Sequence, residues 1–165
     1  TALAKKSLFD MLAPYLPDAL VLDLYSGTGT IGLEALSRGA TSCCFAEYDR
    51  GVVACLKKNI EAFEVENRCR IWSGDISRRL AGWLAQLEAP VDLAFVDPPY
   101  VDSGQWDWAG QEKAIFEPLA AAISEDGLVI LRTQGKSEVP ERLATLSAER
   151  VKKYGDMVIT FFQRN

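Results

Sequence analysis

The fold is decided by the stretch Leu20–Gly32, LVLDLYSGTGTIG, in which an apolar run passes through a glycine-rich loop into a helical pattern. Gly27, Gly29 and Gly32 match the spacing G-x-G-x-x-G, which allows a tight turn and a close approach of the backbone to a ligand. Glu47 lies 20 residues after Gly27, at the end of the next apolar run, where its carboxylate can bind both hydroxyls of a ribose. The pattern predicts a nucleoside-containing cofactor, and it fits a nicotinamide dinucleotide as well as S-adenosylmethionine.

Short apolar runs alternate with amphipathic stretches on both sides of this loop. This rhythm predicts a parallel sheet whose strands are buried on both faces between helices. The predicted strands are Leu20–Tyr25, Ser42–Ala46, Cys69–Trp72, Val91–Val96 and Leu128–Leu131. The predicted helices are Leu3–Leu12, Ile31–Ser37, Arg50–Phe63, Ile76–Leu87, Glu112–Ile123 and Glu138–Leu146. Two further strand-like runs, Glu149–Tyr154 and Met157–Phe162, surround Gly155-Asp156 and predict a hairpin at an antiparallel edge.

The composition is that of one globular domain. The chain has 165 residues, of which 48% are hydrophobic and 25% charged, so a sizeable core is possible and disorder is not expected. No apolar stretch approaches the roughly 20 residues of a membrane span, and no charged-then-apolar leader opens the chain. We therefore expect a single domain over residues 1–165, a monomer without a membrane partner, in the cytoplasm.

The cysteine and histidine content excludes several kinds of site. Cys43, Cys44, Cys55 and Cys69 form no Cys-x2-Cys pair, and the chain has no histidine, so a zinc site is not expected and the thiols are predicted to be buried. The lack of histidine also argues against triad hydrolases and histidine-ligated metalloenzymes. Carboxylates, the backbone and a cofactor remain to carry any chemistry, and nothing in the sequence requires a metal.

The net charge of −5 argues against nucleic-acid binding, because such proteins usually neutralise phosphates with a basic surface. The chain begins at Thr1 without a methionine. We expect a basic segment upstream of Thr1 that would offset the acidic balance.

Two more acidic residues are predicted near the carboxyl ends of strands. Asp23 lies inside the first strand, where an unpaired carboxylate is costly, so we expect it to face the loop and the cofactor. Asp75, in Ser73-Gly74-Asp75-Ile76, can accept a hydrogen bond from an adenine amino group while Ile76 packs on the ring; alternatively, Asp75 simply caps the next helix. These acids and the loop share the carboxyl edge of the sheet, where open α/β folds bind ligands.

The tetrapeptide Asp97-Pro98-Pro99-Tyr100 directly follows the apolar run Leu93–Val96. Two prolines stiffen the turn and leave the Pro98 carbonyl outside any helix or ladder. The Asp97 carboxylate and this carbonyl can accept both hydrogens of an amino group, while Tyr100 offers a ring for stacking. The motif predicts a site for a flat nucleobase that carries an amino group; the alternative is a rigid turn without chemistry.

Aromatic and basic residues near this motif allow two interpretations each. Trp106 and Trp108 could clamp flipped RNA bases, or they could pack over the sheet edge. Four cations could contact phosphates or belong to an ordinary solvated surface. These cations are Arg132, Lys136, Lys5 and Lys6.

With the loop, the acids and Asp-Pro-Pro-Tyr in this order, the chain resembles the Rossmann-like class I S-adenosylmethionine-dependent methyltransferases that modify exocyclic amino groups. Four stretches narrow the resemblance to the bacterial 16S rRNA guanine-N2 methyltransferases. They are Ser7–Leu12, Leu22–Gly29, Gly32–Ala40 and Tyr154–Asp156. The resemblance covers nearly the whole chain.

The resemblance implies a seven-stranded sheet of order 3-2-1-4-5-7-6, with strand 7 antiparallel and helices on both faces. It also implies methyl transfer from S-adenosylmethionine to the N2 of a guanine in 16S rRNA, as free RNA or within an assembling 30S subunit. The catalytic residues are then Asp97, Pro98, Pro99 and Tyr100. The cofactor-binding residues are Asp23, Tyr25, Ser26, Gly27, Thr28, Gly29, Glu47, Tyr48, Asp75 and Ile76. Arg132 departs from the family pattern, in which we expect Glu at this position.

Other activities remain open at this point. The notch formed by the Asp97 carboxylate and the Pro98 carbonyl also suits the N6 of adenine in DNA or RNA. Enzymes that methylate glutamine in proteins usually have Asn at the position of Asp97. A nicotinamide-dependent oxidoreductase would explain the glycine loop but gives no role to Asp-Pro-Pro-Tyr. A cofactor-binding domain without catalysis is the non-enzymatic alternative.

Overall fold

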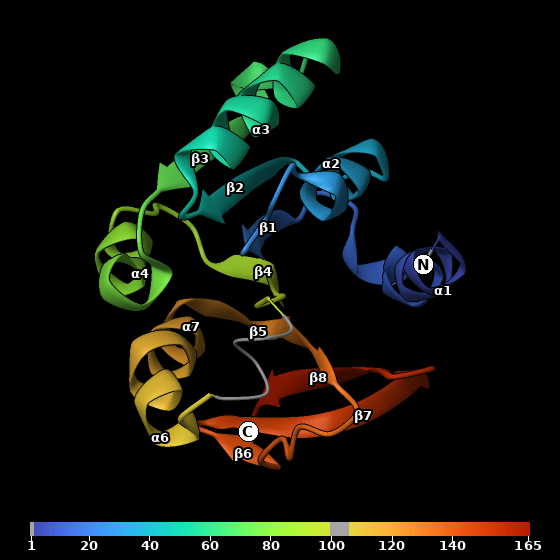
Figure 1. Cartoon of the computed structure of the whole chain (residues 1–165), viewed down its shortest axis with the longest axis vertical. Helices are drawn as coiled ribbons and strands as arrows, with labels where there is room; N and C mark the ends of the chain where they lie inside the picture. Colours follow the sequence, from blue (N-terminus) through green and yellow to red (C-terminus); the bar gives the residue numbers. More distant parts are fainter. Residues whose placement is uncertain (1, 100–105) are drawn as a thin grey trace.

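The computed structural model describes residues 2–99 and 106–165, which form an eight-stranded sheet with helices on both faces (Figure 1). The strands are β1 (Leu20–Leu24), β2 (Ser42–Glu47), β3 (Cys69–Ser73), β4 (Val91–Val96), β5 (Ile123–Gln134), β6 (Arg142–Leu143), β7 (Leu146–Tyr154) and β8 (Met157–Arg164). The helices are α1 (Ala2–Leu12), α2 (Thr30–Ser37), α3 (Arg50–Ala62), α4 (Ile76–Ala85), α6 (Trp108–Gln111) and α7 (Glu117–Ala122). A π-helical segment, η3 (Glu112–Phe116), joins α6 to α7, and short 3-10 turns lie at η1 (Ala13–Tyr15) and η2 (Glu66–Arg68).

The strand order is β3-β2-β1-β4-β5-β8-β7-β6. β1 to β5 are parallel, and β8 pairs antiparallel with β5. This confirms the predicted order 3-2-1-4-5-7-6, in which β7 and β8 are the predicted sixth and seventh strands. The prediction of seven strands is wrong by one, because β6 adds a two-residue strand at the edge, paired antiparallel with β7.

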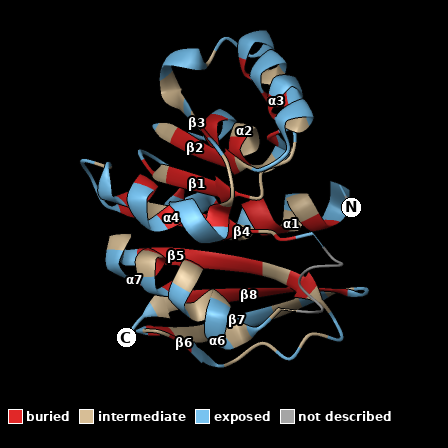
Figure 2. Cartoon of the chain, turned by 60° about the vertical axis from the view of Figure 1, so that its left-hand side comes forward, coloured by how far each residue is buried: buried red, intermediate tan, exposed pale blue. Residues whose placement is uncertain are grey.

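The core lies on both faces of the sheet, as continuous apolar strands require. α1, α2 and α3 cover one face, where Phe9 of α1 and Leu56 of α3 join alternate strand residues such as Val21 and Phe45. The opposite face is covered by α4, η3 and α7, which pack against the intervening strand residues such as Leu22. Figure 2 shows buried residues along the central strands and on the inner sides of the helices.

The contact between α2 and β2 depends on a glycine. An ideal Cβ at Gly32 would lie 2.3 Å from Cε1 of the buried Phe45 and 2.7 Å from Sγ of Cys43. The third glycine of the loop is therefore required for close packing of the helix on the sheet, as its place in the fingerprint suggests.

The predicted helix Glu138–Leu146 is wrong. The structure places β6 and the start of β7 there, joined at Ala144, which has a left-handed φ of 56°. Leu143 and Leu146 are both buried in the core, and the Ala144 amide donates to Glu112 Oε2 at 2.7 Å. The leucine spacing suits an amphipathic helix as well as a tight hairpin over a core, and tertiary packing selected the hairpin.

The prediction of buried thiols is correct for Cys43 and Cys44 but wrong for Cys55, which is exposed, while Cys69 is partly buried. Cys55 lies on α3 outside the stripe of Val53, Leu56 and Ile60 that faces the sheet. A small apolar residue on a helix is buried only when it lies on the face of the helix that packs against the core.

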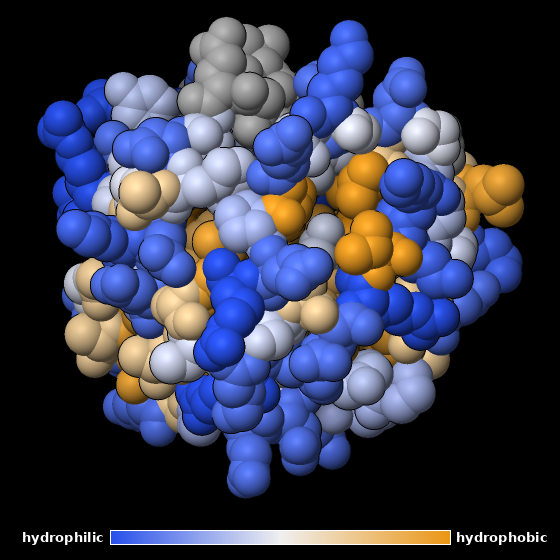
Figure 3. Space-filling model, turned by 90° about the horizontal axis from the view of Figure 1, so that it is seen from below, coloured by the Kyte–Doolittle hydropathy of each residue, from blue (hydrophilic) through white to orange (hydrophobic). Residues whose placement is uncertain are grey.

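No helix within residues 2–99 and 106–165 is long and apolar enough to cross a bilayer. Seen from below, the molecule presents mostly hydrophilic side chains with smaller hydrophobic patches between them (Figure 3).

Replacing Gly32 by Ala should destabilise the fold by about 1–3 kcal/mol, because the added methyl group overpacks a buried contact. Thermal unfolding measures the effect. Gly82→Ala in α4 is the matched control, since a Cβ there meets nothing within 4 Å, and alanine in an exposed helix is neutral or stabilising. Equal melting temperatures for the two variants would contradict the packing role of Gly32.

Candidate functional site

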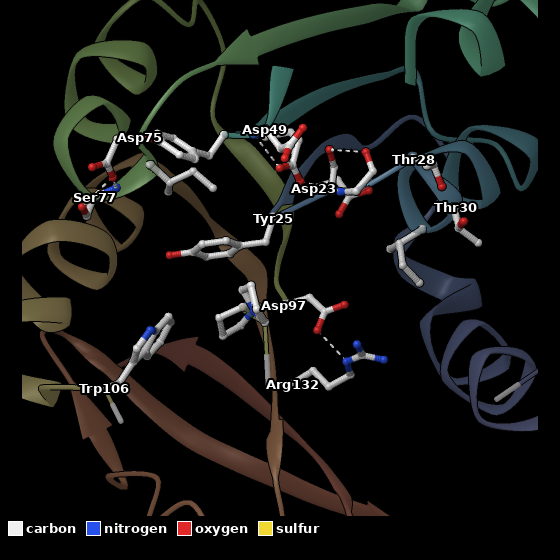
Figure 4. Close-up of a pocket in the computed structure, with 18 of the residues that line it drawn as sticks. Asp23, Tyr25, Thr28, Thr30, Asp49, Asp75, Ser77, Asp97, Trp106 and Arg132 are labelled. Atoms are coloured by element: carbon white, nitrogen blue, oxygen red, sulfur yellow. Dashed lines mark hydrogen bonds and ion pairs between the residues drawn. The ribbon is translucent and has the colours of Figure 1, made fainter. Parts of the chain in front are cut away.

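A pocket of about 1120 Å³ opens at the carboxyl ends of β1 to β4 (Figure 4). Twelve of the residues predicted for the site line it: Asp23, Tyr25, Ser26, Gly27, Thr28, Glu47, Tyr48, Asp75, Ile76, Asp97, Pro98 and Pro99. Gly29 does not line it; a Cβ at Gly29 would lie 2.5 Å from Leu56 Cδ1, so this glycine packs the loop against α3. Tyr100 lies outside the described residues.

The loops around the pocket are aligned because the sheet's hydrogen-bond ladder continues past the strand ends. The amide of Asp97 donates to the carbonyl of Leu24 at 3.3 Å, and the amide of Ser26 donates to the carbonyl of Ala46 at 3.0 Å. The amide of Gly74 donates to the carbonyl of Glu47 at 3.1 Å. Residues that are distant in the sequence are thereby brought to one edge.

Glu47 joins two of these loops. Its Oε1 accepts from the Gly27 amide at 2.9 Å, and its Oε2 accepts from the Asp49 amide at 2.9 Å. Gly27 has a φ of 57°, in the left-handed region that favours glycine. Each carboxylate oxygen keeps a further lone pair for a ligand. The binding of ribose hydroxyls by Glu47 stays a prediction, and the geometry adds a structural role.

Asp23 is 1% exposed, and its Oδ2 accepts from the Gly32 amide at 2.9 Å. It therefore links β1 to the first turn of α2, in addition to lining the pocket. Burial raises the pKa of Asp23 to about 8, with smaller raising contributions from the carboxylates of Asp97 and Glu47, while the Gly32 hydrogen bond lowers it. At neutral pH this carboxyl group is largely protonated.

Asp75 caps α4, as one of the two sequence interpretations proposed. Its Oδ1 accepts from the Ser77 amide at 3.0 Å and from the Ser77 hydroxyl at 2.7 Å. The following Ile76 is buried and lines the pocket. The adenine contact proposed for Asp75 and Ile76 stays a prediction and is compatible with the cap.

Asp97 lies beside Arg132, and Arg132 Nε is 2.5 Å from Asp97 Oδ1 (Figure 4). Burial raises the pKa of Asp97, and the charge and hydrogen bond of Arg132 lower it. The sequence allowed two interpretations of Arg132, as a contact to a phosphate or as part of an ordinary solvated surface. The structure shows instead an ion pair inside the predicted notch, which no local pattern could reveal because it spans two strands.

Aromatic rings form the wall of the pocket near α6. The Trp106 ring lies 6.3 Å from Tyr25, 5.5 Å from Trp108 and 6.4 Å from Phe116, measured between centroids. Trp106 thus packs over the sheet edge, as one interpretation held, and it also lines the pocket. Whether it clamps a base stays a prediction.

Sequence reasoning missed Gln111 as a pocket residue. Gln111 ends α6 and lines the pocket, and its buried Oε1 has no hydrogen-bond partner among the described residues. A buried acceptor without a partner is costly, so a ligand donor is a natural partner for it. Its only signal in the sequence was its position three residues after Trp108.

Replacing Asp23 by Asn should change how stability depends on pH. Because the folded pKa is raised above the unfolded value of about 3.9, the contribution of Asp23 to stability is present below pH 4 and is lost as pH rises to about 8. The stability of the wild type relative to Asp23→Asn should therefore fall between these values, by roughly 1.4 kcal/mol per pH unit at most. Denaturant unfolding at several pH values measures this, with Asp126→Asn on the exposed surface as the control. A constant difference would contradict the raised pKa.

Known proteins similar to this chain were found by sequence and by structure. The ribosomal RNA small subunit methyltransferase D of Escherichia coli K12 is 30% identical over 97% of this chain and 76% of that protein. A conserved hypothetical protein of Streptococcus pyogenes has a TM-score of 0.79 and 30% identity, covering 98% of this chain and 95% of that one. A hypothetical protein of Thermus thermophilus has a TM-score of 0.80 at 24% identity, covering 99% of this chain and 86% of that one, and so shows the shared fold.

The family model described as conserved hypothetical protein 95 matches residues 1–163. The match spans the loop, the acids and the Asp-Pro-Pro-Tyr motif, and together with the Escherichia coli relative it confirms the family resemblance expected from these motifs. The chain therefore belongs to the conserved hypothetical protein 95 family.

Proposed function

We propose that this chain transfers a methyl group from S-adenosylmethionine to the exocyclic N2 of a guanine in 16S ribosomal RNA. The observation that carries the proposal is the position of Asp97 and Pro98 on the edge of a pocket that also holds the glycine loop and Glu47. The name of the Escherichia coli relative supports methyl transfer as the reaction and small-subunit ribosomal RNA as the substrate class.

The charge of the pocket fits S-adenosylmethionine. Five carboxyl groups line the pocket, of which all but that of Asp23 supply negative charge at neutral pH, and the described basic residues in its lining are Lys5 and Arg132. The carboxyl groups are those of Asp23, Glu47, Asp49, Asp75 and Asp97. Such a lining attracts a ligand with a cationic sulfur and an ammonium group, and it repels a pyrophosphate. This observation disfavours the nicotinamide dinucleotide that the loop alone left open.

The pocket residues have complementary tasks in holding this cofactor. Glu47 would accept from the ribose hydroxyls, and Asp75 and Ile76 would hold the adenine, by hydrogen bond and by packing. Gly27 and its neighbours would bring the backbone close to the ligand, because Gly27 lines the pocket and has no side chain to occupy the open space beside it. When bound, S-adenosylmethionine supplies a methyl group made electrophilic by the positive sulfur.

The notch would act on the guanine amino group. N2 is a poor nucleophile because its lone pair delocalises into the ring. Asp97 and the Pro98 carbonyl would accept the two N2 hydrogens, which favours a pyramidal nitrogen with its lone pair directed at the methyl carbon. N2 would form a bond to that carbon as the carbon–sulfur bond breaks and its electron pair goes to sulfur. The N2 proton then leaves to Asp97 or to water.

Positioning and electrostatics account for most of the rate enhancement in this scheme. Holding two reactants in line supplies about 7–11 kcal/mol through effective molarity alone. Asp97 need not be a strong base, because the N2 proton becomes acidic once the methyl group is attached. Tyr100, which the sequence predicts to stack on the base, belongs to the same proposal.

The choice of guanine over adenine rests on the family resemblance, because the notch suits either amino group. The test is transfer of labelled methyl from S-adenosylmethionine to 16S rRNA and to 30S particles that lack the modification, followed by nucleoside analysis. We expect N2-methylguanosine. N6-methyladenosine would support the adenine alternative, and cofactor binding without any methylated product would support a non-catalytic domain.

Replacing Asp97 by Ala should lower methyl transfer by about 10²–10³-fold, because the amino group loses a charged hydrogen-bond acceptor. The dissociation constant for S-adenosylmethionine, measured by calorimetry, should change little. Asp126→Ala, on the exposed surface at the start of β5, is the control for loss of a carboxylate. Normal turnover by the Asp97 variant would remove Asp97 from the mechanism.

We further propose that residues 1–165 act as one domain, as a monomer, in the cytoplasm, where ribosomal RNA is the partner. The two core clusters on opposite faces of one continuous sheet support a single folding unit.

A further inference from the structure

Arg132 and Asp97 are neighbours because of the register between two parallel strands. Val96, the last residue of β4, pairs with Leu131 of β5, so the residues that follow them, Asp97 and Arg132, lie side by side at the pocket edge. Arg132 is itself held within the sheet, since it pairs with Ile159 of β8. The register of the sheet therefore sets the contact, although Asp97 itself is the first residue after β4.

The ion pair constrains both side chains. Arg132 Nε lies 2.5 Å from Asp97 Oδ1, and the two side chains are 37% and 24% exposed. Arg132 Nη1 also lies 3.6 Å from Met157 Sδ, which braces the guanidinium from the β8 side. One carboxylate oxygen of Asp97 is thus engaged, and Oδ2 can serve as the acceptor for a substrate amino group.

Burial opposes the ionisation of Asp97. The other carboxyl groups in the lining of the same pocket are those of Asp23 from β1, Glu47 from β2, Asp49, and Asp75 at the start of α4. Lys5 of α1 also lines it, but its Nζ lies 3.2 Å from Glu34 Oε1. Burial raises the pKa of Asp97, and Arg132 is the group that lowers it. A protonated Asp97 would present a hydroxyl group that donates a hydrogen bond. In the notch the substrate amino group also donates, so the two groups would be mismatched.

We propose that Arg132 is a positioning residue that holds Asp97 as an oriented, ionised carboxylate ready to accept a hydrogen bond from the substrate amino group. The inference rests on the proposed function, in which Asp97 binds that group. It goes beyond what the family resemblance implies, because that resemblance led us to expect Glu at position 132.

The pH dependence of turnover tests the proposal. Arg132→Gln should shift the acidic limb of the kcat profile to higher pH by about one unit, so that kcat falls by up to about tenfold on that limb and little at high pH. Arg132→Lys should restore most of the profile, because it restores the charge. Arg142→Gln, at an exposed position of β6, should leave the profile unchanged.

Other roles for Arg132 give different results, each of which overturns the proposal. A rise in KM with an unchanged kcat profile would indicate a phosphate contact to the RNA. An equal loss of kcat at every pH would indicate a purely structural ion pair, and a gain at every pH would indicate that Arg132 blocks the notch. Melting temperature and the dissociation constant for S-adenosylmethionine confirm that each variant is folded.

A direct measurement separates this proposal from the proposed function. The titration of the Asp97 carboxyl group, followed by NMR of carbon-13-labelled aspartate in the intact protein, requires no turnover. Assignment uses Asp97→Asn, which removes the signal. The Asp97 pKa should be higher in Arg132→Gln than in the wild type, even if no RNA substrate is methylated. An unchanged pKa would refute the role of Arg132, whereas a raised pKa without guanine methylation would refute only the proposed function.

Discussion

The parallel hydrogen-bond ladder through β4, β1, β2 and β3 is the constraint on which the rest of the structure depends. Because the strands pair in register, their carboxyl ends lie at the same edge of the sheet. Single hydrogen bonds between an amide and a carbonyl then join the loops that follow these strands. Backbone groups in a buried sheet must be paired, so the register tolerates little slippage. The carboxylates that follow the strands consequently meet at one edge.

This arrangement concentrates negative charge, and the structure manages it by three means. Glu47 and Asp75 accept backbone amides at the starts of loops and helices, where partial positive charge offsets their own. Asp23 is buried with a raised pKa and carries little charge at neutral pH. Asp97 is compensated by the guanidinium of Arg132. The pocket can thus attract a cationic cofactor without excessive repulsion among its own acids.

The same acidity bears on RNA binding. A net charge of −5 and an acidic pocket offer no broad electrostatic attraction for phosphates. Within the described part of the chain, recognition of an RNA substrate would therefore draw on local contacts around the mouth, where Lys5 and Trp106 lie.

Most of the fold and most of the pocket were predictable from local patterns. Buried parallel strands appear as continuous apolar runs, and the glycine loop, Glu47, Asp75 and Asp97 follow such runs directly. The patterns failed where local preference was ambiguous: the leucine spacing at Glu138–Leu146 suited a helix or a hairpin, and Cys55 showed no sign of its phase on α3. Gln111 was also missed, because its position three residues after Trp108 is too weak a sign that it reaches the pocket.

The sequence by itself determined the order of elements, the glycine loop and the residue types at the strand ends, because these depend on periodicity and backbone conformation within a few residues. The tertiary structure alone decided which of these groups touch. The Asp97–Arg132 pair follows from the register of β4 and β5, and the raised pKa of Asp23 follows from its burial beneath α2. Both are properties of segments that are distant in the chain, since charge interactions and desolvation depend on distances in space.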